Sequence, residues 1–239
     1  MTEPLRSRDA LPAGWYDLSP PICPATAVFP GDAAFSAALA MAFERGDHLR
    51  LTTWTTTPHV GAHADAPCHY AADGPGIGER PVARYIGDAQ VVSVNTRQGE
   101  RIAPGDLLRP VLAPRVLLRT DSFADPNQWR DDFCSLSVEL VEHLAALGVV
   151  LVGLDTPSVD PGPAKTLLAH AAVHRADLAI LEGLDLRGVP DGLYTLLAQP
   201  LRVQGGDASP VRALLVPRQP GLETGPVLRS PVASALNHG

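Results

Sequence analysis

The sequence predicts a single α/β domain that is rich in β structure. Apolar residues make up 45% of its 239 positions and charged residues 19%, so there is enough apolar material for a sizeable core and no sign of a disordered chain. The expected elements come in a mixed order: strands, then alternating helices and strands, then more strands. Neither a GxGxxG motif nor a P-loop occurs, so a doubly wound nucleotide-binding fold is not expected.

Short apolar or Thr-rich segments predict the strands of the first half. They lie at 15–22, where a Pro-Pro pair ends the strand, and at 48–57, 89–95 and 114–121. The segment PGDAAF at 30–35 reads as a turn followed by the start of another element.

The clearest helix is expected at 137–148, with Ser137 as its N-cap and Gly148 at its end. Its apolar stripe has helical spacing and consists of Val138, Leu140, Val141, Leu144 and Leu147. The nearly all-apolar stretch 149–156 predicts a buried strand, followed by a helix at 164–177 and a strand at 178–184. Two strands at 192–203 and 210–217 are expected to pair across the turn GGDASP.

Composition sets the domain limits and excludes several classes of protein. We expect an N-terminal extension at 1–14, the domain at 15–217, and a peripheral tail rich in Pro and Gly at 218–239. A net charge of −7 with no long basic run argues against a nucleic-acid partner. The N-terminus lacks an apolar segment of signal-peptide length, and no stretch reaches the length of a membrane span. Three sparse cysteines, Cys23, Cys68 and Cys134, fit a reduced cytoplasmic setting.

The stretch 57-TPHVGAHADAPCHY-70 concentrates metal-ligating chemistry. His59, His63 and His69 fall within eleven residues, together with Asp65. Pro58, Gly61 and Pro67 make a regular helix poor, and in an extended chain the odd-numbered side chains point to one side. Neutral imidazole and carboxylate suit zinc, manganese or iron. We therefore expect a metal site that lacks one further ligand; the alternative is a polar surface loop.

His69 has a second possible role, because it lies beyond Pro67 and has an ordinary pKa near 6.5, which suits proton transfer. The region 153–184 supplies candidates for the missing ligand. His170 and His174 are four apart on an expected helix, and Glu182 ends an apolar strand, where it is either a ligand or turned to solvent. Asp155 and Asp160 flank a Pro-rich loop and are expected to form turns. His143 and His174 are expected at the surface.

Several blocks of sequence resemble the bacterial kynurenine formamidases of the metal-dependent cyclase-like amidohydrolase family. They run in order from about Trp15 to Pro217: TPHVGAHADAPCHY, PRVLLRT, GLDTPSVDP, AKTLLAH, AILEGL and DASPVRA. The first block points to the wider family, and the later ones point to the formamidase branch. The resemblance implies a β-rich fold of the swivelling β/β/α type, assembled as a homodimer.

The resemblance also implies a role for each site residue. Two divalent ions, usually zinc, with manganese as the alternative, would be held by five ligands: His59, His63, Asp65, His170 and Glu182. His69 matches the proton-transfer histidine. The family usually has Trp in WPGD, which stacks on an aryl substrate; here the motif is 29-FPGD-32, so Phe29 takes that place. Cys68 stands where Leu is usual, and Leu167 and Leu168 replace Met-Asp.

The activity implied is metal-dependent hydrolysis of the aryl formamide N-formyl-L-kynurenine to L-kynurenine and formate, in tryptophan degradation. The absence of GxSxG argues against a serine-hydrolase route. Two alternatives stay open: a related aryl or cyclic amide hydrolase resembling isatin hydrolase, and a metal-binding protein without catalysis.

Overall fold

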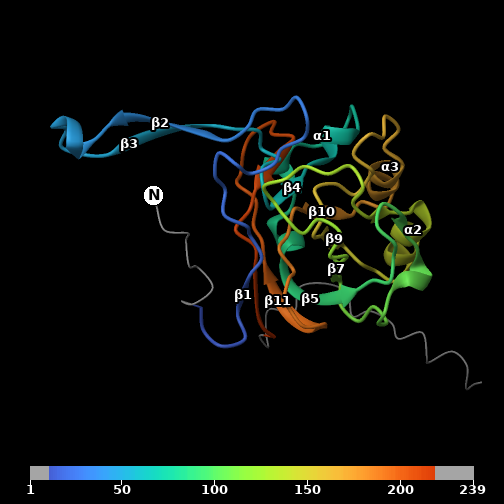
Figure 1. Ribbon diagram of the computed structural model, residues 1–239. Helices are drawn as coiled ribbons and strands as arrows, with labels where there is room; N and C mark the ends of the chain where they lie inside the picture. Colours follow the sequence, from blue (N-terminus) through green and yellow to red (C-terminus); the bar gives the residue numbers. More distant parts are fainter. Residues whose placement is uncertain (1–10, 219–239) are drawn as a thin grey trace, which may run out of the picture.

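A computed structural model describes residues 11–218, which build one β-rich α/β domain around a large mixed sheet (Figure 1). The expected fold class is therefore confirmed. The expected extension at 1–14 and the tail at 218–239 lie almost entirely outside the described residues.

The nine-stranded sheet has the order β1-β13-β11-β5-β7-β9-β10-β4-β12. In chain order its strands are β1 (Tyr16–Asp17), β4 (His63–Asp65), β5 (Ile86–Ser93), β7 (Arg115–Arg119), β9 (Leu151–Leu154), β10 (Ala179–Glu182), β11 (Gly192–Leu197), β12 (Ala208–Pro210) and β13 (Leu214–Pro217). The central strands β5, β7, β9 and β10 are parallel, whereas the strands on both sides of them pair antiparallel.

Alternating side chains of the parallel strands supply two cores, one on each face of the sheet. Val116 and Leu118 of β7 join one apolar cluster with the helices α2 (Val138–Ala146) and α3 (Leu168–Arg175), while Leu117 joins the other cluster. The period of two follows from the pleat of a strand. The two helices thus cover one face of the sheet, as Figure 1 shows.

Most local predictions agree with the structure, with shorter elements. Helix α2 begins after Ser137, whose Oγ accepts a hydrogen bond from the backbone N–H of Leu140 at 3.0 Å, and it ends before Gly148 (φ 87°). The expected closing pair of strands is also present, since β11 pairs antiparallel with β13.

Two local predictions were wrong. The expected turn 205–210 contains the edge strand β12, which pairs with β4. The stretch 57–70 is not extended throughout, because the short helix α1 occupies Pro67–Tyr70. Pro67 stands at the first position of α1, where its fixed φ favours a helix and its missing N–H is not needed.

A β-hairpin arm projects from the body of the domain (Figure 1). It consists of β2 (Ser36–Met41) and β3 (Leu51–Thr55), joined through the 3-10 helix η2 (Phe43–Arg45). The remaining short elements are the parallel pair β6 (Arg101–Ile102) and β8 (Ser135–Leu136), and the 3-10 helices η3 (Ile77–Glu79), η4 (Val82–Tyr85) and η5 (Pro104–Asp106). Within the described residues, no helix is both long and apolar enough to cross a membrane.

Candidate metal centre

Strand β4 carries two of the candidate ligands on one face. His63 and Asp65 are two residues apart in the strand, so their side chains point the same way. The neighbouring strand β10 places Glu182 opposite His63 in register, and the Nε2 atom of His63 lies 3.2 Å from Oε2 of Glu182. All three side chains are buried. The pairing of two strands thus brings together residues that are far apart in the sequence.

The two other histidines of the 57–70 stretch flank this strand. His59 lies in the preceding turn, with its Nδ1 3.0 Å from Oδ1 of Asp65. His69 lies on α1, and its ring centre is 4.3 Å from that of His59. The intervening Gly61 has a φ of +62°, and its carbonyl oxygen is 2.9 Å from Nδ1 of His63. This contact fixes the ring of His63 with Nε2 directed at the carboxylates.

Helix α3 supplies His170 from the helical face of the sheet. Its Nε2 lies 3.5 Å from Oδ2 of Asp65 and 3.9 Å from Oε1 of Glu182. Glu182 Oε1 also accepts a hydrogen bond from the backbone N–H of Val159 at 2.7 Å. The structure therefore gathers all six residues predicted from the sequence for metal binding and proton transfer around one point. His143 and His174 are exposed, as expected.

The sequence did not predict the role of Asp160, whose carboxylate lies behind the candidate ligand His170. Asp160, expected to form a turn, is fully buried and accepts a hydrogen bond from Nδ1 of His170 at 2.9 Å. Asp160 also accepts hydrogen bonds from the backbone N–H groups of Ala169 and His170 in the first turn of α3, at 3.1 and 3.0 Å. A guanidinium N–H of Arg101 donates a further hydrogen bond to it at 2.9 Å. Asp160 thus fixes the ring of His170 and caps its helix. Its place in the GLDTPSVDP block was the available signal.

Asp207 was also missed, because it lies in the segment expected to be a turn. Its Oδ2 lies 3.2 Å from Nε2 of His59 and 3.7 Å from Nδ1 of His69. It therefore adds a carboxylate to the exposed side of the site. Its place at the start of the DASPVRA block was the available signal, but its position beside the histidines depends on the pairing of β12 with β4.

The donor set fits divalent metal ions. Among the described residues, the Nε2 atom of His63 and both carboxylate oxygens of Asp65 are buried without a hydrogen-bond partner. Burying such groups unsatisfied is costly, and a cation would satisfy all three. Two ligand groups share Asp65: one with His59 and His69, the other with His63 and Glu182. A set of imidazoles and carboxylates suits zinc or manganese.

The electrostatics of the site respond to the crowded carboxylates. Burial alone would lower the pKa of His63 and His170, but close carboxylates outweigh it and raise each pKa to about 10. Burial would raise the pKa of Asp65, yet the surrounding imidazoles hold it well below its usual range. His69 differs, because burial lowers its pKa. It is therefore a neutral base at pH 7, whereas His63 and His170 are protonated in the metal-free protein.

A cavity of about 610 Å³ opens onto the site. His59, His63, His69, His170 and Glu182 line it, and so do the aromatic residues Phe29, Phe123 and Trp129. The rings of Phe29 and Trp129 meet edge to face with centroids 5.5 Å apart, and Phe123 lies 6.3 Å from Trp129. Phe29 is thus one member of an aromatic wall. The indole of this wall belongs to Trp129, which the sequence did not identify as a site residue.

The fold and the site define an α/β protein with a candidate carboxylate-rich metal site that adjoins an aromatic-lined cavity. The model of the Cyclase family, described as "Putative cyclase", matches residues 16–161. The chain therefore belongs to the Cyclase family.

Solved structures share this fold. A potential metal-dependent hydrolase with cyclase activity is 24% identical, with a TM-score of 0.73, and the match covers 86% of this chain and 98% of that one. A predicted metal-dependent hydrolase from Bacillus stearothermophilus is 23% identical, with a TM-score of 0.71 over 84% and 97% of the two chains. Isatin hydrolase A from Labrenzia aggregata, bound to benzyl benzoate, is 24% identical, with a TM-score of 0.71 over 86% and 94%.

Proposed function

We propose that this protein is a metal-dependent hydrolase that cleaves the amide bond at an aromatic nitrogen, with N-formyl-L-kynurenine as its substrate. One observation carries the proposal. The Nε2 atom of His63 and the carboxylate oxygens of Asp65 are buried without a hydrogen-bond partner, and they lie beside a cavity lined by aromatic rings. The metal donors fit amide hydrolysis, and the wall fits an aryl group.

Five residues would hold the ions: His59, His63, Asp65, His170 and Glu182. Divalent ions at such ligands polarise an amide carbonyl and make water a stronger nucleophile. We propose that these residues would hold two zinc ions, with manganese as the alternative. The carbonyl of Gly61 and the carboxylate of Asp160 fix the rings of His63 and His170, which orients their Nε2 atoms before any ion binds.

His69 is assigned the proton transfer. Hydrolysis adds the oxygen of water to the formyl carbon, breaks the carbon–nitrogen bond and leaves formate and an aniline nitrogen that must gain a proton. Burial lowers the pKa of His69, so its imidazole is neutral at pH 7 and able to take a proton from water. His69 lines the cavity and adjoins His59, so it can deliver that proton to the departing nitrogen.

The aromatic wall is assigned the substrate ring. Phe29, Trp129 and Phe123 line the same cavity as the metal ligands and contact one another in series. An aryl ring placed among them would gain offset or edge-to-face contacts, each worth about 0.5–1.5 kcal/mol beyond area burial. Phe29 offers less area than the tryptophan expected at its position, and the adjacent Trp129 offsets that loss.

A second candidate substrate is isatin, a cyclic amide on an aromatic ring. Three solved structures with the same fold are isatin hydrolases, and one is bound to the product analogue thioisatinate. The same donors and the same aromatic wall suit that reaction. The two candidates differ in their polar parts, because N-formyl-L-kynurenine carries an amino-acid group and isatin does not.

The test is hydrolysis of both compounds by chelator-treated protein with and without added zinc or manganese. We expect N-formyl-L-kynurenine to be turned over only after metal is restored, with the appearance of L-kynurenine followed by its absorbance. Turnover of isatin alone would move the assignment to the second candidate. Stoichiometric metal binding without hydrolysis of either compound would refute the proposal and leave a metal-binding protein.

We further propose that the chain forms a homodimer through its hairpin arm. Trp54, Phe43 and Leu51 on this arm are 71%, 64% and 51% exposed, which is unusual for such large apolar side chains. A second copy of the chain would remove them from water. Light scattering should report a dimer for the wild type and a monomer for Trp54→Ser, while Leu201→Ser, at another exposed apolar position, stays dimeric.

A reducing compartment such as the cytoplasm is proposed as the location, because Cys23, Cys68 and Cys134 form no disulfide.

A further inference from the structure

Charged side chains other than the candidate metal ligands line part of the cavity. Asp32, Asp121, Asp155 and Asp185 are the aspartates among its lining residues, and Arg187 contributes a guanidinium. Among the described residues that line the cavity, Arg187 is the one lysine or arginine. A cavity with fixed groups of both signs differs from one suited only to a neutral aromatic ring.

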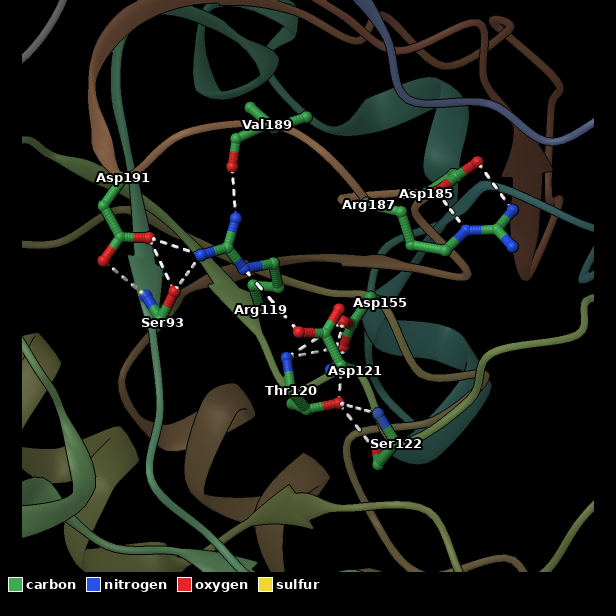
Figure 2. A network of polar contacts seen from close by, with 10 residues as sticks. All are labelled: Ser93, Arg119, Thr120, Asp121, Ser122, Asp155, Asp185, Arg187, Val189 and Asp191. Carbon is green, nitrogen blue, oxygen red and sulfur yellow. Dashed lines mark hydrogen bonds and ion pairs between the residues drawn. The ribbon is translucent and has the colours of Figure 1, made fainter.

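Arg187 is held in one orientation. Its Nε and one terminal nitrogen donate hydrogen bonds to the two oxygens of Asp185 at 2.8 and 2.9 Å (Figure 2). Its other terminal nitrogen donates to the carbonyl of Ala124 at 2.9 Å. Such a fork of parallel hydrogen bonds fixes the plane of the guanidinium. Asp185 and Arg187 follow Glu182 along the chain, so the pair is attached directly to the strand that carries a candidate metal ligand.

Asp121 is held in place by buried structure. Its backbone has a φ of +53°, a left-handed conformation that Asp tolerates better than most residues. The carboxylate of Asp155, which is buried, accepts its N–H at 2.8 Å and that of Thr120 at 2.9 Å (Figure 2). The side chain of Asp121 stays exposed, 3.9 Å from Nε of Arg119. A carboxylate is therefore presented to the cavity on a fixed backbone.

Asp121 lies close enough to Arg187 for its charge to act on the guanidinium. The pKa of Arg187 is raised, first by its hydrogen bonds to Asp185 and further by the charges of Asp125 and Asp121. Arg187 is exposed, so its pair with Asp185 contributes little to stability.

We propose that Asp121 and the Asp185–Arg187 pair form a subsite for the amino-acid head group of a zwitterionic aryl amide. Arg187 binds the α-carboxylate, and Asp121 binds the α-ammonium. The inference rests on the proposed function and narrows it, because N-formyl-L-kynurenine carries both groups and isatin carries neither. The aromatic wall and the metal donors serve both compounds, so discrimination between them falls to this charged subsite.

The test compares N-formyl-L-kynurenine with ortho-formamidoacetophenone, which has the same aryl formamide without the head group. Arg187→Met keeps the apolar stem, and Asp121→Asn keeps a residue that tolerates positive φ. We expect each substitution to lower kcat/KM for N-formyl-L-kynurenine by about 10- to 100-fold, the loss typical of one charge-assisted hydrogen bond. For ortho-formamidoacetophenone we expect less than about a threefold change. Arg130→Met, which removes an exposed guanidinium paired with Asp132, is the matched control.

Equal losses for the two substrates, or no loss for either, would overturn the subsite. If the wild type hydrolyses neither compound, the proposed function fails, and binding then decides the inference. Tryptophan fluorescence, to which Trp129 in the cavity wall contributes, would follow binding of L-kynurenine and of ortho-aminoacetophenone. A selective loss of L-kynurenine affinity in Arg187→Met supports the subsite, and equal affinities in both proteins overturn it.

Discussion

Replacing Asp160 by Asn tests whether its carboxylate, which fixes the ring of His170, stabilises the protein and its metal site. In the wild type, Oδ1 accepts hydrogen bonds from Ala169 and Arg101, and Oδ2 accepts two from His170. Asn retains one oxygen and replaces the other with an NH₂ donor. Whichever way the amide turns, two donors lose their acceptor and face another donor.

The expected magnitude comes from the contacts and from the pKa of the carboxyl. Burial would raise the pKa of Asp160, but its hydrogen bonds, led by that from His170, lower it from 3.8 to about 2. That difference corresponds to about 2 kcal/mol of stability for the ionised form. A lost partner for a buried donor costs about 1–3 kcal/mol. We therefore expect Asp160→Asn to lower the free energy of unfolding by about 2–4 kcal/mol, and to weaken metal binding by about 10- to 100-fold through the freed ring of His170.

Urea unfolding of the metal-free protein and competition with a chromophoric chelator measure these two effects. Because the folded pKa of Asp160 is lowered, its stabilisation is complete above the unfolded value near 4 and is lost as pH falls toward 2. The stability gap between wild type and variant should shrink by about half at pH 3. Asp132→Asn, at an exposed pair with Arg130, should leave the free energy of unfolding nearly unchanged. Unchanged metal affinity in a folded Asp160→Asn protein would refute the reasoning.

Three further outcomes are expected. His69→Ala should keep its metal content by mass spectrometry and lose about 10²- to 10⁴-fold in kcat, because a proton-transfer group is removed. Asp65→Ala, in contrast, should lose the metal. A metal-free His69→Ala protein would show that His69 is a ligand. In the metal-free protein the pKa of His170 is raised to about 10, so its imidazole is protonated at pH 7. Metal binding at pH 7 should therefore release protons, and metal affinity should rise with pH. Calorimetry in buffers of different ionisation enthalpy measures this release, and a result of no release would contradict the prediction. Gly183→Ala should have a lower Tm, because Gly183 has a φ of +65° and an added Cβ would lie 2.3 Å from the carbonyl oxygen of Gly61. An unchanged Tm would show that the segments around Gly183 and Gly61 can move apart without cost.

Sequence reasoning predicted those parts of the site that depend on local geometry. His63 and Asp65 alternate along a strand, and their shared direction follows from the period of two. The apolar stripe and Ser137 located α2 to within a few residues. The same period wrongly extended the strand to His69, because Pro67 starts a helix there.

The parts that depend on distant pairing were not accessible from the sequence alone. From its own sequence context Glu182 could be a ligand or face solvent, and only the family resemblance favoured the ligand; its register with His63 becomes visible when β10 lies beside β4. Asp160 read as a turn former because its partners on α3 are set by the path of a Pro-rich loop. Asp207 was hidden in a Gly-rich segment whose edge strand is specified by its neighbour and not by its own propensity.

The position of β4 between β10 and β12 has a consequence for the order in which the protein matures. Both neighbours of this short strand are encoded more than one hundred residues after it, and β12 lies close to the end of the domain. On the ribosome, the 57–70 segment emerges long before any strand that can hold it, and closing such long loops is slow. Its imidazoles and carboxylate therefore remain dispersed until nearly the whole domain has been synthesised. Metal capture would then follow the synthesis of β10 rather than start folding, because a nascent chain stalled before this strand lacks Glu182 and the β10 partner of β4.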